Sequence, residues 1–161
     1  MNKNLIARAS ITINAPAVRV WGALVNPEAI KQCMFGTHVA TDWREGSPIT
    51  WKGEWQGKQY EDKGVILRCE PPRVLQYSHF SPLSGLPDKP ENYHTVTIEI
   101  ASDGNHTTVS LFQDKNATEE VRMHSEKMWG MMLTALKQLL EKNSSQSTSR
   151  GIPYDNALSA G

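Results

Sequence analysis

The sequence predicts an α+β domain in which a long C-terminal helix lies across a curved antiparallel β-sheet. Two features of the sequence support this prediction. From residue 37 to residue 114 the chain is a succession of strand-like stretches separated by turn residues, without a helical period. From residue 118 to residue 142 apolar residues recur at the spacing of one helix face. Because a sheet and an amphipathic helix each need a partner for their apolar face, we expect the two to pack together.

The composition is that of a single globular domain without a strong net charge. The chain has 161 residues, and 17 basic side chains balance 17 acidic ones. Such a balance gives no general attraction to nucleic acid or to an anionic membrane. No apolar run reaches the roughly 18 residues of a membrane span, and the N-terminal stretch lacks the apolar core of a signal peptide. We therefore expect a cytoplasmic protein that binds no nucleic acid and does not insert into membranes.

The first segment is predicted to be a strand followed by two short helices. Residues 5–13 largely alternate apolar and polar side chains, which is typical of a half-buried strand. Pro16 suits the first turn of a helix, because its missing N–H would have no partner there. Asn26, Pro27 and Glu28 repeat this signal with a capping side chain and a carboxylate in the first turn. Helices are therefore expected over residues 16–24 and 27–33.

The middle of the chain is predicted to be a meander of antiparallel strands. Turn residues such as Glu45-Gly46, Gln56-Gly57 and Asp103-Gly104 separate stretches of alternating polarity. The expected strands are 37–43, 48–55, 58–69, 73–80, 94–101 and 106–114. Residues 81–92 contain three prolines and no periodicity, and a connection of this length in a compact domain is either functional or mobile.

The C-terminal segment is predicted to be one long helix and a flexible tail. Asn116 with Glu119 resembles a capping box, and the apolar face extends from there to about Lys142. Residues 143–161 are rich in Ser, Gly, Asn and Thr, which is typical of a disordered extension. We therefore expect a domain over residues 1–142 and a flexible tail over residues 143–161.

The order of these elements, together with several short motifs, resembles a known superfamily. The matching stretches are Ile13-Asn-Ala-Pro16, Val20-Trp21-Gly-Ala-Leu24, Asn26-Pro27-Glu28, Asp42-Trp-Arg-Glu-Gly46, Trp51-Lys-Gly53, Asp62-Lys-Gly64-Val65, Glu70-Pro71-Pro-Arg73-Val-Leu75 and the region around Trp129. The chain thus resembles the START-like, or SRPBCC, superfamily with its helix-grip fold over residues 5–142. Within that superfamily it resembles the family named after activators of the heat-shock chaperone ATPase.

The resemblance implies a cavity between the sheet and the long helix. Members of the superfamily bind lipids, sterols, polyketides or plant hormones there, and some are cyclases. A twisted sheet that curls around a helix leaves apolar walls facing each other. Strand alternation and helical phase are expected to direct ten side chains to this cavity. They are Trp51, Trp55, Val65, Leu67, Tyr77, His79, Ile98, Met128, Trp129 and Met132.

The first functional hypothesis is therefore the binding of a small apolar or amphipathic molecule, with the loop over residues 81–92 as a gate. The alternative is a chaperone-accessory module that uses the outer sheet face or the exposed candidates Leu83 and Leu86. A third hypothesis, an enzyme of the cyclase or hydrolase type, rests on His79, Tyr77 and nearby carboxylates. For each cavity residue, packing in the core is the competing interpretation.

The sequence contains no motif for a metal, a cofactor or a nucleophilic catalyst. Cys33 and Cys69 lack the spacing of a redox or zinc site, and the histidines lie on separate elements without metal-ligand spacing. We therefore predict no catalytic residues, no metal and no cofactor, and we leave open whether the protein is a monomer or a homodimer.

Overall fold

The computed structural model describes residues 5–150, and for Trp55 and residues 143–150 it describes the backbone alone. The strands are β1 (Leu5–Ile13), β2 (His38–Ala40), β3 (Pro48–Trp55), β4 (Lys58–Glu70), β5 (Val74–His79), β6 (His94–Asp103) and β7 (His106–Asn116). The helices are α1 (Ala17–Leu24), α2 (Pro27–Cys33) and α3 (Glu119–Arg150), with short 3-10 turns η1 (Pro82–Ser84) and η2 (Pro90–Asn92). The two short helices and the meander therefore confirm the predicted order of elements.

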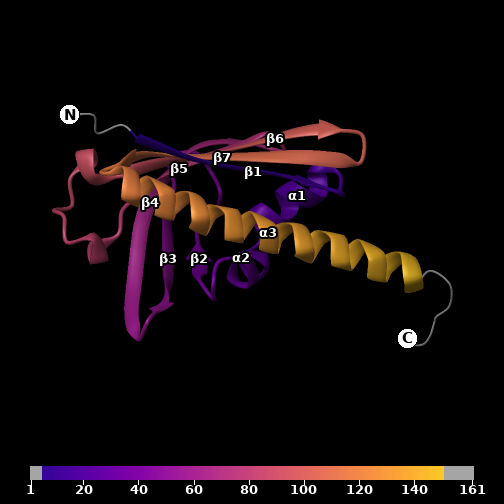
Figure 1. The fold of residues 1–161 in the computed structure, drawn as a ribbon, viewed down its shortest axis with the longest axis horizontal. Helices are drawn as coiled ribbons and strands as arrows, with labels where there is room; N and C mark the ends of the chain where they lie inside the picture. The colour runs from indigo at the N-terminus through magenta and orange to yellow at the C-terminus, as the bar shows by residue number, and fades with distance from the viewer. Residues whose placement is uncertain (1–4, 151–161) are drawn as a thin grey trace.

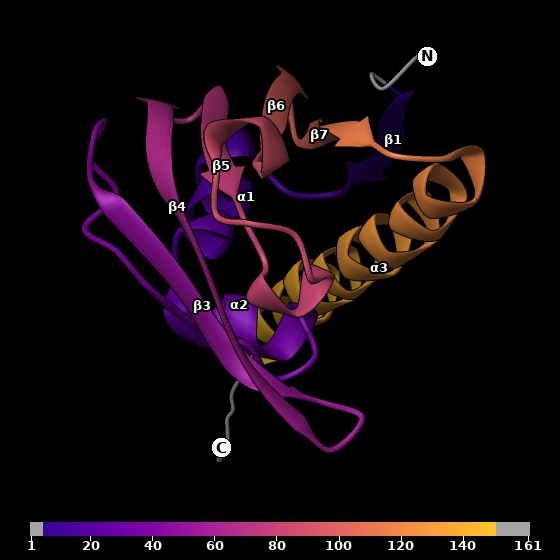
Figure 2. The ribbon, with the colours of Figure 1, turned by 90° about the vertical axis from the view of Figure 1, so that its left-hand side faces the viewer.

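Within the described residues the strands form one seven-stranded antiparallel sheet in the order β1-β7-β6-β5-β4-β3-β2. Figure 1 shows α3 running along one side of this sheet, with α1 and α2 on the same side. In Figure 2 the β3–β4 hairpin bends away from β6, β7 and β1, so that the sheet curves around the space beside α3. A curved antiparallel sheet with a long helix across its concave face is the helix-grip fold, which confirms the predicted fold class.

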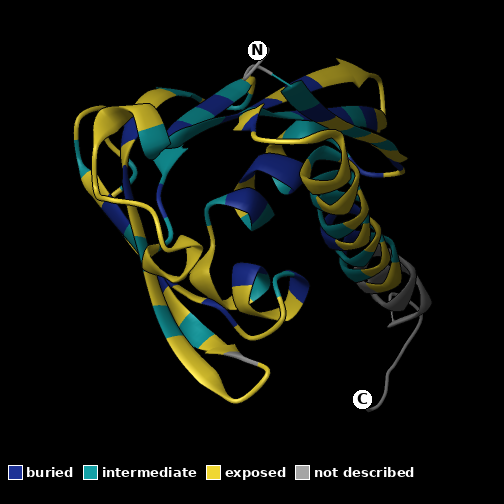
Figure 3. Cartoon of the chain, turned by 60° about the vertical axis from the view of Figure 1, so that its left-hand side comes forward, coloured by how far each residue is buried: buried dark blue, intermediate teal, exposed yellow. Residues whose placement is uncertain are grey.

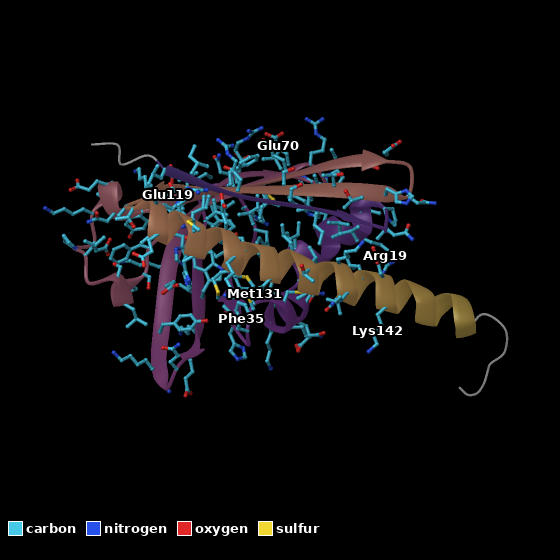
Figure 4. The ribbon with its side chains drawn as sticks, viewed as in Figure 1. Arg19, Phe35, Glu70, Glu119, Met131 and Lys142 are labelled. Atoms are coloured by element: carbon cyan, nitrogen blue, oxygen red, sulfur yellow. The ribbon has the colours of Figure 1, made fainter. Side chains whose placement is uncertain are left out.

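Helix α3 is fastened to the edge strand β1 through side chains that bond the strand backbone. Glu126 accepts a hydrogen bond from the backbone N–H of Arg8 at 3.0 Å, and Glu141 accepts one from that of Asn14 at 2.8 Å. An exposed edge strand presents unpaired backbone groups. The helix therefore satisfies one donor that β1 cannot pair within the sheet and one from the residue that follows the strand. Arg19 of α1 adds a bond of 3.3 Å to the carbonyl of Leu140 (Figure 4).

The core lies between the concave face of the sheet and the three helices. Buried rows come from alternate positions of the central strands, such as Leu75 and Tyr77 on β5 and Val96 and Ile98 on β6. Tyr77 and Ile98 were expected to face inward. Figure 3 shows buried and exposed residues following each other along the strands, and buried residues on the short helices. The remaining fully buried anchors, which come from the edge strands and helices as well, include Ile13, Val20, Ile49, Ile66, Val109, Leu111, Leu133 and Leu136.

The predicted inward orientation of Val65 and Leu67 on β4 is wrong. Val65 is 38% exposed and Leu67 is 42% exposed, whereas Ile66 between them is fully buried. The pairing of β4 with β5 shifts between Ile66 and Arg68, which leaves Leu67 as an extra residue in a β-bulge. One extra residue inverts which side chains face inward. Alternation counted back from Cys69 therefore gives the wrong face on the other side of the bulge.

The start and the end of α3 also differ from expectation. The hydroxyl of Thr118 caps the helix by accepting from the N–H of Val121 at 3.1 Å, whereas the side chain of Asn116 is buried and bonds elsewhere. The helix continues beyond the predicted end at Lys142 to Arg150. Residues 151–161 of the predicted tail lie outside the described residues, so the domain boundary and the flexible tail stay predictions.

Candidate functional site

A cavity of about 350 Å³ lies between the concave face of the sheet and the N-terminal half of α3. Its apolar wall includes Met34, Trp51, Tyr77, Met128, Trp129 and Met132. Its polar wall includes Asp62, His79, His94, Gln113, His124 and Ser125. A second, smaller void of about 40 Å³ shares Met34, Trp51, Tyr77 and Met132 with the first. These four side chains therefore separate a larger chamber from a deeper apolar one.

The predicted site residues fall into four groups. Six of them line the larger cavity, namely Trp51, Tyr77, His79, Met128, Trp129 and Met132. Ile98 lines the smaller void instead. Val65 and Leu67 are exposed on the other face of β4, and the side chain of Trp55 lies outside the described residues. Whether any of these residues binds a ligand stays a prediction.

Trp129 is held against the cavity by a network of hydrogen bonds at the end of β7. Its indole N–H donates to Oε1 of Gln113 at 2.6 Å. Gln113 in turn donates to Oδ1 of Asn116 at 3.2 Å, and Ser125 of α3 donates to the same oxygen at 3.0 Å. The Asn116 side chain also donates to the carbonyl of Leu5 at 2.9 Å. One buried asparagine therefore links β1, β7 and α3 beside the cavity.

An aspartate and a histidine form a hydrogen-bonded pair in the polar wall. Asp62 of β4 and His79 of β5 lie 2.8 Å apart, from Oδ2 to Nε2, and their side chains are 15% and 28% exposed. A carboxylate only accepts hydrogen bonds when it is ionised, so Nε2 of His79 carries the proton. The other oxygen, Oδ1, is buried and has no hydrogen-bond partner among the described residues. Such an unpaired buried acceptor costs about 1–3 kcal/mol.

His94, at the start of β6, is a second histidine in this wall, with its ring centre 6.3 Å from that of His79. Its Nδ1 lies 2.8 Å from the backbone carbonyl of Asp114. Because a carbonyl oxygen can only accept, Nδ1 must carry a proton. Burial, as the largest cause, lowers the pKa of His94, and the nearby His79 adds to this. His94 is therefore a neutral imidazole whose Nε2 bears a lone pair.

Ring contacts of Trp51 with Tyr77 and with His79 connect the apolar wall of the cavity to its polar wall. The ring of Trp51 lies 5.1 Å from that of Tyr77 and 5.0 Å from that of His79, in an edge-on arrangement with the histidine. Burial raises the pKa of Tyr77, so its phenol stays protonated at neutral pH. The indole of Trp51 and the protonated phenol of Tyr77 are therefore uncharged groups beside the chamber.

The loop over residues 81–92 closes one side of the polar wall through Ser81, which lines the cavity. It is an ordered structure with its own contacts. Lys63 of β4 forms a salt bridge of 2.5 Å with Asp88, and the Tyr93 hydroxyl donates to the same carboxylate at 2.6 Å. The ring of Tyr93 also stacks on Phe80 at 5.1 Å. Gating by this loop stays a prediction.

Sequence reasoning did not identify Asp62, His94 and Gln113 as cavity residues. Asp62 shares the inward face of β4 with Tyr60, Gly64 and Ile66. The signal that could have found it is alternation counted from Ile66 toward the start of the strand. His79, His94 and His124 come from three separate elements and line one cavity, which no spacing in the sequence reveals.

Two further features of the described part of the chain bear on function. Among residues 5–150, no group of three or more His, Cys, Asp or Glu side chains is placed to hold a metal ion. No helix in that range is long and apolar enough to cross a membrane.

A helix-grip protein with a mainly apolar cavity under its long helix is the class that this fold and site define. The chain matches the model of one family, described as activator of Hsp90 ATPase homolog 1-like protein, over residues 14–141. It therefore belongs to that family, within the START-like superfamily that the sequence resembles. No curated protein matches the chain.

Solved structures support the same assignment. ChR145 from Cytophaga hutchinsonii is 56% identical, with a TM-score of 0.78, and the match covers 90% of this chain and 99% of that one. CalU16 from Micromonospora echinospora is 24% identical, with a TM-score of 0.63 and coverage of 92% of each chain. The Aha1 dimer from Colwellia psychrerythraea is 18% identical, with a TM-score of 0.66 and coverage of 85% and 96%. The last two are similar in fold alone.

Proposed function

We propose that the domain binds a small apolar or amphipathic molecule in the chamber between the sheet and α3. The observation that supports this most is the cavity of about 350 Å³ with its aromatic and methionine wall. Ligand sites are typically concave, mostly apolar and equipped with a few polar groups that set orientation. Methionine side chains adapt to irregular apolar shapes because they are unbranched and flexible. A chamber of this volume is poorly explained by packing alone, since protein interiors are close-packed.

The arrangement of the walls also suggests how a molecule lies in the chamber. The polar groups Asp62, His79 and His94 come from neighbouring strands and lie beside Ser81 and the loop. The smaller void lies behind Trp51 and Met132. An amphipathic molecule would therefore place its polar end toward the Asp62 corner and its apolar part toward Met132.

The proposal is tested with the neutral fluorescent dye N-phenylnaphthylamine, whose emission rises in apolar surroundings. We expect saturable binding to the wild-type protein with one site per chain. Met128→Trp places a larger side chain in the chamber and should reduce the affinity at least about tenfold, because dye and indole compete for the same space. The measurement is a fluorescence titration of dye with protein, supported by native mass spectrometry of gently purified protein.

The matched control is Met131→Trp on the same helix. Met131 is 47% exposed and does not line the cavity, and Figure 4 labels it on α3. This variant should bind the dye like the wild type, and thermal unfolding of both variants checks that they fold. No saturable uptake by the wild type, or equal loss of binding in the two variants, would contradict the proposal.

The chaperone-accessory interpretation stays an alternative. It is supported by the family description and by Leu83 and Leu86 in the loop, each 53% exposed. The enzyme hypothesis, a cytoplasmic location and the oligomeric state also stay predictions. Stimulation of a chaperone ATPase by this domain, lost on Leu86→Asp and unaffected by Met128→Trp, would favour the accessory role over the ligand-binding one.

A further inference from the structure

The hydrogen-bond donors that line the chamber are largely occupied by protein acceptors. The indole of Trp129 donates to Gln113, and the hydroxyl of Ser125 donates to Asn116. The hydroxyl of Thr37 donates to the carbonyl of Met34 at 2.7 Å. Since that hydroxyl has one proton, the bond of 2.6 Å between Thr37 and Tyr60 must be donated by the tyrosine.

Several hydrogen-bond acceptor atoms of the polar wall, by contrast, receive no hydrogen bond from the described residues. Nδ1 of His94 donates to the carbonyl of Asp114, so Nε2 of this neutral ring can only accept. His79 donates from Nε2 to the carboxylate of Asp62. The carboxylate of Asp62 receives this one bond, and its buried Oδ1 has no partner among the described residues. This corner is therefore short of donors.

The charged side chains around the chamber lead to the same conclusion as the hydrogen bonds. Among the described residues that line it, Asp62 is the acidic side chain, and no Lys or Arg is present. A carboxylate, phosphate or sulfate group entering this corner would meet Asp62 without a fixed positive charge to offset the loss of water. The hydroxyls of Tyr77 and Ser81 can accept as well as donate, and the Trp51 indole can only donate. None of these three supplies a positive charge.

We propose that the chamber selects amphipathic molecules whose polar end donates hydrogen bonds and carries no negative charge, namely a hydroxyl or a protonated amine. This inference rests on the proposed binding function. The polar end supplies the missing donor to Asp62 and meets the acceptor atom Nε2 of His94. A protonated amine also offsets the charge of Asp62 and lies near the faces of Trp51 and Tyr77, which attract cations.

The test uses four naphthalenes that differ only in the group at one ring position: hydroxyl, aminomethyl, methoxy or carboxylate. Affinities are measured by nuclear magnetic resonance titration of isotope-labelled protein, which also shows whether the shifts lie at the chamber. The hydroxyl and aminomethyl compounds should bind at least about tenfold more tightly than the methoxy compound, because a missing donor leaves buried acceptors unpaired. The carboxylate compound should bind most weakly of the four.

Two variants connect the selectivity to Asp62. Asp62→Asn keeps the shape, removes the charge and adds a donor, so it should weaken the aminomethyl compound and strengthen the carboxylate compound, each by about tenfold or more. Asp103→Asn makes the same change on the exposed β6–β7 hairpin and should alter neither affinity. Equal affinities of the hydroxyl and methoxy compounds, or a preference for the carboxylate, would overturn this inference and leave the binding function standing. Binding of none of the four and of no dye would overturn both.

Discussion

Gly64 is the single residue on which the approach of β4 to β5 depends most directly. A Cβ atom built at this position would lie 1.7 Å from the backbone carbonyl oxygen of Ser78. No side chain fits there without moving a strand backbone, because the obstructing atom belongs to the main chain. The glycine lies between Asp62 and Ile66 in the inward row of β4, so its small size also determines how closely Asp62 and His79 approach.

We expect Gly64→Ala to lower the free energy of unfolding by about 3 kcal/mol or more, since overpacking against a backbone atom is not relieved by rotation of a side chain. Gly22→Ala on α1 is the matched control. A Cβ at Gly22 meets no atom within 4 Å, and alanine in a helix interior gains roughly 0.5–1 kcal/mol over glycine. Urea denaturation measures both. Similar effects of the two substitutions would contradict the close approach.

At the scale of the element, β4 is the strand in which the β-bulge at Leu67 changes which alternate residues face inward. Before the bulge the even-numbered residues Asp62 and Ile66 face inward, and after it Cys69 does. The bulge therefore lets a single strand present Asp62 to the chamber near one end and an apolar residue to the core near the other. Bulges often re-aim side chains next to functional sites in this way.

The bulge predicts that truncation of the adjacent residues Ile66 and Leu67 will lower the free energy of unfolding by different amounts. Ile66→Ala removes a fully buried side chain and should cost about 2–5 kcal/mol. Leu67→Ala removes the same number of carbon atoms from a side chain that is 42% exposed and should cost less than about 1 kcal/mol. Chemical denaturation of the two variants provides the measurement. A larger loss for Leu67 would mean that the strand has the regular alternation that the sequence alone suggests.

The boundaries of some elements were predictable from the sequence because turn residues and periodicity are local properties. The start and end of α2 at Pro27 and Cys33, and the hairpin at Gly104, follow from residues a few positions apart. The bulge at Leu67 was not predictable, since it depends on how β4 pairs with β5 rather than on the residues of β4 themselves. The phase error at Val65 and Leu67 follows directly from that missing information.

Residues of the candidate site were predictable where the alternation of a strand or the period of a helix determines which way a side chain faces. Trp51, Tyr77 and Met132 follow from strand alternation or helical phase and do line the cavity. Asp62 was not predictable as a cavity residue, because a lone charge in a strand usually faces solvent. Its hydrogen-bond partner is His79, which lies 17 residues away in the sequence and is brought beside it by the pairing of β4 with β5.

At the scale of the whole molecule, we expect pH to affect stability through the half-buried His94. Its folded pKa is lowered from the ordinary value of 6.5, chiefly by burial, with Asp114 opposing the shift and His79 and Lys115 adding to it. As the pH falls below about 6.5, the unfolded chain takes up a proton that the folded chain does not. Protonation therefore favours unfolding, and this contribution to stability is lost as the pH falls toward the folded pKa.

We expect the melting temperature of the wild type to fall between about pH 7.5 and about pH 5.5, and to fall less in His94→Asn. Asparagine keeps a donor for the carbonyl of Asp114 and does not titrate. His38→Asn is the control, because His38 is exposed, and it should retain the wild-type slope. Calorimetry across this pH range measures the difference. An unchanged slope in His94→Asn would assign the pH dependence to other groups.

Two of the five tryptophans, Trp51 and Trp129, form part of the chamber wall. Indole emission changes in colour and intensity when water beside the ring is exchanged for an organic molecule. The protein thus carries a built-in optical reporter and requires no label. Fractions of a crude metabolite extract can be added one after another, and any fraction that turns the emission bluer holds a candidate for the natural occupant.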